Sequence, residues 1–150
     1  MKNIAVLLIL LIFFSINGFA CDCIGGQSVK EALKNANAVL LGKVIKIEKF
    51  EIPSGYTNIK FYKVKNTLLV TKVYKGNIQT QTVEVVSGID SGDCGFQFEI
   101  NNNYIVYGYW STKHFPEGDE VQKHLTTHIC TRTTKEVQSE KIQIELTNKN

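Results

Sequence analysis

Four cysteines constrain this chain more than any other feature of its sequence. They are Cys21, Cys23, Cys94 and Cys130. A bridge between Cys21 and Cys23 would close a very tight and strained ring, because disulfide geometry fixes the separation of the two Cα atoms. Both early cysteines are therefore expected to pair with distant ones, which leaves two possible connectivities. Either one fastens Cys21 to the body of the fold, although chain termini normally fray.

The first 20 residues have the character of a secretory signal peptide. They carry one basic residue, Lys2, then an apolar run over 4–14 and an end at Gly18-Phe19-Ala20. The apolar run is shorter than a membrane span requires. Cleavage after Ala20 would leave Cys21 as the first residue of a secreted chain, where structural disulfides are the usual state of cysteine. Two alternatives stay open, namely a redox or metal-binding Cys-x-Cys pair and acylation of Cys21 in a lipoprotein.

Composition indicates one folded domain and argues against a nucleic-acid partner. The 150 residues are 43% hydrophobic and 21% charged, with 2 prolines. Such a chain is neither disordered nor of low complexity. Lys2 is the only charged residue before Cys21, so the remaining 130 residues carry a net charge of +2 rather than +3. So small an excess of positive charge, with no basic and aromatic stripe, does not favour nucleic acid.

The hydrophobic pattern predicts a mostly β chain. Ser28 and Glu31 have capping-box spacing and predict a short helix to about Ala36. β-branched and alternating segments predict five strands, at 38–47, 58–74, 82–86, 104–110 and 125–130. Turns are expected at 53–55 and 75–77, and a terminal helix at 133–145. Five strands without a βαβ rhythm favour an antiparallel, five-stranded Greek-key barrel with one or two short helices and two disulfides.

No segment indicates an enzyme. His124 and His128 have the i, i+4 spacing of a helical zinc site, but on a strand such residues lie roughly 13 Å apart. Asp90, Ser91 and Gly92 weakly resemble the surroundings of a catalytic serine, without a fold that would supply its base and oxyanion hole. The acids Asp90, Asp93 and Glu99 lack the spacing of an EF-hand loop. We interpret the segment as a glycine-rich turn with solvated acids.

Six short motifs in order resemble the N-terminal domain of the tissue inhibitors of metalloproteinases (TIMPs) and the wider netrin-like (NTR) module. They are Cys21-Asp-Cys23, Asn37-Ala-Val-Leu-Leu-Gly-Lys-Val44, Val73-Tyr-Lys-Gly76, Asp93-Cys-Gly-Phe96, Asn103-Tyr-Ile-Val-Tyr-Gly108 and His128-Ile-Cys-Thr-Arg-Thr133. The resemblance covers 21–133, so it implies an OB-fold domain there and leaves 134–150 as a terminal helix or tail. It also implies the bridges Cys21–Cys94 and Cys23–Cys130.

The same resemblance implies a function for the first residues. The amine and carbonyl of Cys21 would chelate the catalytic zinc of a partner zinc metalloendopeptidase, and Asp22 would enter its specificity pocket. Cys23 and the loop Ser91-Gly92-Asp93 would complete the partner-binding surface. The chain would then be a secreted, monomeric inhibitor with no cofactor of its own. The alternatives are a non-inhibitory adhesion or binding module, with or without a lipid anchor on Cys21, and a carbohydrate- or oligonucleotide-binding OB domain.

Overall fold

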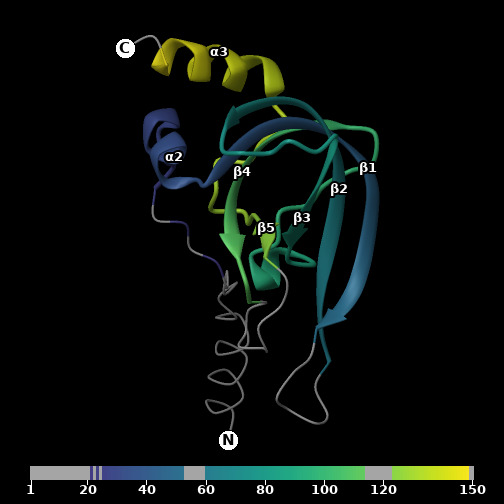
Figure 1. The fold of residues 1–150 in the computed structure, drawn as a ribbon. Coiled ribbons are helices and arrows are strands. Elements are labelled where there is room, and N and C mark those ends of the chain that lie inside the picture. The colour runs from purple at the N-terminus through teal and green to yellow at the C-terminus, as the bar shows by residue number, and fades with distance from the viewer. Residues whose placement is uncertain (1–20, 22, 24, 53–59, 114–122, 149–150) are drawn as a thin grey trace, which may run out of the picture.

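The described part of the protein is mostly β, with two short α-helices and two disulfides (Figure 1). The computed structural model describes residues 21, 23, 25–52, 60–113 and 123–148. The predicted turn at 53–55 and the signal segment 1–20 lie outside these residues. The described elements are α2 (Val29–Asn35), β1 (Ala38–Ile52), β2 (Phe61–Lys75), β3 (Thr82–Ser87), the 3-10 helix η1 (Ser91–Asp93), β4 (Asn103–Ser111), β5 (His124–Thr126) and α3 (Val137–Thr147).

The five strands hydrogen-bond in a closed ring, in the order β1-β2-β3-β5-β4. Four of the neighbouring pairs are antiparallel, while β3 and β5 are parallel through Val85 with Leu125 and Val86 with Thr126. The prediction of a wholly antiparallel arrangement is therefore wrong. A closed ring with an odd number of strands cannot alternate in direction all the way around, so at least one neighbouring pair must be parallel.

Two apolar clusters lie on the two faces of the ring. Along β4, Tyr104 and Val106 belong to the cluster inside the ring, whereas Ile105 and Tyr107 belong to the cluster outside it. This alternation follows from the two-residue period of a strand. The outer cluster also includes Ile144 of α3 and buried residues of α2, so the helices cover this face and leave β4 buried on both sides.

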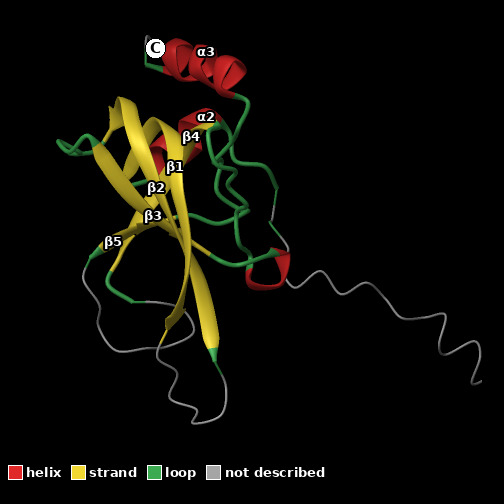
Figure 2. Ribbon diagram, turned by 90° about the vertical axis from the view of Figure 1, so that its right-hand side faces the viewer, coloured by secondary structure: helices red, strands yellow, loops and turns green. Residues whose placement is uncertain are grey.

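The two helices lie at the same end of the ring (Figures 1 and 2). The predicted capping box is present in α2, where the Ser28 hydroxyl accepts from the Glu31 N–H and the Glu31 carboxylate accepts from the Ser28 N–H. The terminal helix begins at Val137, four residues later than predicted. Its start is delayed because Thr134 still forms a β-bridge with Ile105, which keeps the preceding chain extended.

Two strand lengths also differ from the predicted ones. β1 continues to Ile52, because its antiparallel register with β2 extends as far as the Ile52–Phe61 pair. β5 ends at Thr126 instead of continuing to Cys130. At Thr127, the first residue after β5, the hydroxyl donates to the Tyr107 carbonyl of β4 at 3.2 Å.

Candidate site at the clamped N-terminal segment

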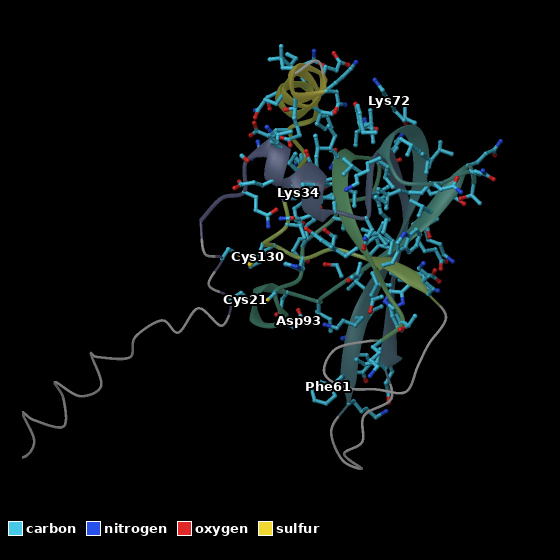
Figure 3. The ribbon with its side chains drawn as sticks, turned by 60° about the vertical axis from the view of Figure 1, so that its left-hand side comes forward. Cys21, Lys34, Phe61, Lys72, Asp93 and Cys130 are labelled. Atoms are coloured by element: carbon cyan, nitrogen blue, oxygen red, sulfur yellow. A yellow bond between two sulfur atoms is a disulfide. The ribbon has the colours of Figure 1, made fainter. Side chains whose placement is uncertain are left out.

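Two disulfides fasten the start of the described chain to two different loops. Cys21 is bonded to Cys94, with the Cα atoms 5.6 Å apart, and Cys23 is bonded to Cys130, with the Cα atoms 5.1 Å apart. This is the pairing that the TIMP resemblance implies. We call these two bridges, together with loop 88–95, the clamp. Figure 3 shows Cys21, Cys130 and Asp93 gathered in one region. Because the bridges flank position 22, they restrain the chain on both sides of it.

The carboxylate of Asp93 organises loop 88–95 from within. It accepts hydrogen bonds from the N–H of Ile89 at 3.0 Å, from the N–H of Asp90 at 3.1 Å and from Lys63 Nζ at 3.1 Å. Partial burial raises the pKa of this carboxyl, but the hydrogen bonds from Asp90, Lys63 and Ile89 outweigh burial and hold the pKa below its usual value. The carboxylate therefore fixes the shape of the loop.

Close backbone approaches complete the same loop. The carbonyl of Asp90 accepts from the Gly95 N–H at 2.7 Å, and its carboxylate accepts from the Gly92 N–H at 2.7 Å. A Cβ at Gly88 would collide with the Asp93 carboxylate. Cys94 itself has a φ of 59°, in the left-handed region that non-glycine residues seldom occupy. Such a backbone persists only where neighbouring contacts hold it, and here the Cys21 bridge and the loop hydrogen bonds do so.

The second clamped loop joins the first through its backbone. The N–H of Ile129 donates to the carbonyl of Cys94 at 3.0 Å, and the N–H of Cys130 donates to His128 Nδ1 at 3.2 Å. Behind this turn the Thr127 hydroxyl oxygen lies 2.8 Å from that of Thr131 and 2.7 Å from that of Thr133. These buried threonines were not among the predicted site residues. The only sequence signal for them is that they surround Cys130.

The structure thus brings together part of the predicted partner-binding set. Cys21, Cys23, Gly92 and Asp93 lie at the clamp, and Ser91 begins η1 beside them. Asp22 lies outside the described residues. Within the part of the chain that the structure describes, no three His, Cys, Asp or Glu side chains converge to hold a metal.

A partly buried ion pair, which was not predicted from the sequence, connects the turn after Cys130 to the helices. Arg132, two residues after Cys130, donates from Nε to Glu140 at 2.7 Å, from one Nη to the same carboxylate at 2.9 Å and from the other to the Gln27 carbonyl at 2.8 Å. The Tyr107 hydroxyl donates to Glu140 at 2.6 Å. Burial and the Glu140 carboxylate raise the pKa of Tyr107, so the phenol stays protonated. Arg132 therefore links the segment after Cys23 to α3.

Comparison of the sequence with protein families and with curated proteins found no match. None of the described helices is long and apolar enough to cross a membrane. The described residues form a disulfide-linked ring of five strands with a covalently clamped N-terminal segment. Two disulfides are typical of proteins from an extracellular or otherwise oxidising environment.

Proposed function

We propose that the ring is a five-stranded Greek-key OB barrel of the TIMP and netrin-like kind. The strand order supports this proposal, because β5 leaves the sequential order to lie between β3 and β4. The cysteine pairing supports it too, since the resemblance implied the two observed bridges out of the possible ones. On this basis residues 1–20 are a signal peptide that is removed, and the mature protein begins at Cys21.

On this fold we propose that the protein is a secreted inhibitor of zinc metalloendopeptidases. The observation that carries the proposal is the clamp, in which two cysteines one residue apart are bonded to different loops. A flexible terminus would lose conformational freedom on binding, and a segment already fixed in its bound shape avoids most of that cost. A rigid terminal cysteine is suited to a task that depends on the position of its backbone atoms.

The chemistry of that task is chelation. Catalytic zinc has three protein ligands and one open position, normally taken by water. The α-amino nitrogen and the carbonyl oxygen of Cys21 would bind there together and displace the water. An α-amino group has a pKa of about 7.7 to 8.0, so its deprotonation near neutral pH costs little free energy. Asp22 would then enter the specificity pocket of the protease, and Gly92 and Asp93 would contact its rim. The zinc belongs to the partner.

The N-terminal amine provides the test. Protein that begins at Cys21 is compared with protein that carries one added alanine before Cys21, and with protein whose Cys21 amine is acetylated. A variant with one alanine added after Asn150 is the matched control. We expect inhibition of at least one member of a panel of zinc metalloendopeptidases by the native and control forms. The two blocked forms should lose it, because neither presents a chelating amine at the proper depth.

Two results would overturn this proposal. One is undiminished inhibition by the acetylated protein, which would exclude chelation. The other is the absence of inhibition by the native form across the panel, when intact-mass analysis shows an unmodified Cys21 and both disulfides. The same analysis of the exported protein detects a lipid on Cys21, which would instead indicate an anchored binding module.

A further inference from the structure

A groove lies beside the clamp on the outer face of the ring. It has a volume of about 680 Å³, and its lining includes Phe61, Tyr62, Val86, Lys113, Thr126 and His128. Sites for small ligands commonly enclose about 300 to 1,000 Å³. The groove is thus large enough for a small molecule or for the end of a peptide, and it does not include Cys21 or Cys23.

The floor and one wall of the groove are apolar. Val86 of β3 and Thr126 of β5 are paired in the parallel register, so their side chains lie side by side on the same face of the sheet. Phe61 begins β2 and, by the two-residue period of the strand, lies on the same face as Val86, where it forms the aromatic wall. Tyr62 also lines the groove, but its ring belongs to the opposite face, where Lys49 Nζ lies 4.3 Å from the ring centroid. An aromatic or branched aliphatic group would gain free energy by leaving water for this surface.

Two of the polar groups in the groove, on Lys113 and His128, are hydrogen-bond donors. Lys113 is exposed, and its ammonium group has no hydrogen-bond or ion-pair partner among the described residues. His128 Nδ1 accepts a hydrogen bond from the Cys130 N–H at 3.2 Å, so the proton of the neutral imidazole is on Nε2, which is a donor. The ring of His128 is stacked against Tyr109, which holds its orientation.

Asp93, the acidic residue in the described lining, does not neutralise the positive charge of Lys113. Asp93 is bound by Lys63 at 3.1 Å, and the Lys63 side chain is only 13% exposed, so the two form a closed pair within the wall. Among the residues that the structure describes, Lys113 therefore remains a cation without a paired acid, next to apolar surface. A ligand that complements both features carries a negative charge and an apolar body.

From this arrangement we infer that the groove binds an apolar group that carries a carboxylate, with the carboxylate at Lys113 and His128 and the apolar group against Phe61 and Val86. The ligand is either a small carboxylic acid or the C-terminal residue of a peptide. The site is separate from the proposed zinc-chelating residue, so the inference does not depend on inhibition of any protease.

The experiment uses the secreted, oxidised protein and 3-phenylpropionate, titrated by calorimetry and by amide chemical shifts. The neutral analogue 3-phenylpropan-1-ol has nearly the same shape and should bind much more weakly. Lys113→Gln should weaken binding of the acid about tenfold, the loss expected for one charge-assisted hydrogen bond. Lys113→Arg should retain most of the affinity. Lys30→Gln, on the exposed face of α2, is the matched control and should leave binding unchanged.

A second arm distinguishes the two sources of the carboxylate. The peptide acetyl-Gly-Gly-Phe is compared in its acid and C-terminal amide forms. Binding of the acid peptide alone would assign the groove to a peptide C-terminus, while binding of both acids would assign it to the carboxylate and aromatic group they share. The inference is overturned when neither acid shifts the amides of Val86 and Thr126. It is equally overturned when the alcohol binds as tightly as 3-phenylpropionate, or when Lys30→Gln weakens binding as much as Lys113→Gln.

Discussion

The clamp and the helix-covered end of the strand ring are stabilised by different kinds of interaction. At the clamp, the described residues of loop 88–95 contribute no side chain to either apolar cluster, and the shape depends on two disulfides and on hydrogen bonds to Asp90 and Asp93. At the helix end, α2 and α3 bury an apolar cluster against β1 and β4, and the Arg132–Glu140 pair lies beside it.

The difference between these two regions shows which interactions hold a loop in shape when it buries little apolar surface. Under the function proposed above, the clamp presents backbone atoms to a partner and so does not bury them in a core, which leaves covalent and polar contacts to fix its shape. The helix end has no such restriction and is stabilised in the usual way, by apolar area removed from water. Arg132 follows Cys130 by two residues and bonds both Glu140 of α3 and the carbonyl of Gln27, which precedes the N-cap of α2.

The largest effect is expected from removal of one bridge. In Cys23→Ala/Cys130→Ala, the unfolded chain regains the freedom of a loop with a sequence separation of 107 residues. The chain-entropy model gives a loss of about 4 to 5 kcal/mol in the free energy of unfolding. Denaturation in guanidinium chloride measures this loss, and the same variant should also lose any protease inhibition. A loss smaller than that of the Glu140 variant described next would reverse the ranking of the two ends.

A smaller effect is expected at the helix end from Glu140→Ala. The substitution leaves Arg132 without its carboxylate partner and the buried Tyr107 hydroxyl without its acceptor. Breaking a fully buried pair costs about 3 to 5 kcal/mol, and since the Arg132 side chain is 27% exposed we expect about 2 to 3 kcal/mol. Thermal and denaturant unfolding measure the change.

The matched control for this variant is Glu136→Ala, at an exposed position where the side chain makes no capping hydrogen bond. It should change the free energy of unfolding by less than about 0.5 kcal/mol. Equal losses in the two variants would mean that the Arg132–Glu140 pair contributes nothing specific. Increased amide exchange around Gln27 in Glu140→Ala alone would show that α3 also steadies the segment after Cys23.

The sequence predicted the features that depend on local pattern. The β-branched run after Ala38 and the alternation from Phe61 to Tyr74 gave the two long strands, and Ser28 with Glu31 gave the start of α2. Features that depend on contacts between distant residues were missed or left open. The parallel pair of β3 and β5 follows from ring closure, and the late start of α3 follows from the bridge between Thr134 and Ile105.

In the candidate site, too, some features were predictable from the sequence and others depend on contacts between distant residues. Spacing alone excluded a Cys21–Cys23 bridge, but it left two connectivities that only a three-dimensional arrangement separates. The resemblance implied a place for Asp93 on the partner-binding surface, and that role stays a prediction. Its hydrogen bonds to two loop N–H groups and to Lys63 were not foreseen. Lys63 lies 30 residues earlier in the chain, and no local pattern relates the two side chains.

The smallest of the three expected changes in the free energy of unfolding concerns the Asp93 carboxylate, and it depends on pH. The pKa of Asp93 is lower in the folded protein than its usual value of 3.8. Its ionised form therefore adds stability that is fully present above the pKa of the unfolded chain, about 3.9, and is lost as the pH falls through the lower, folded-state pKa. Asp93→Asn removes this contribution, so the variant should be less stable near neutral pH, with a shallower loss of stability below about pH 4.

Denaturant unfolding of the wild type and of Asp93→Asn at a series of pH values measures both stability curves, with Glu136→Gln as an exposed control. Wild-type and Asp93→Asn curves that stay parallel through this range would mean that disulfides alone, without the carboxylate, hold the clamp loop in place.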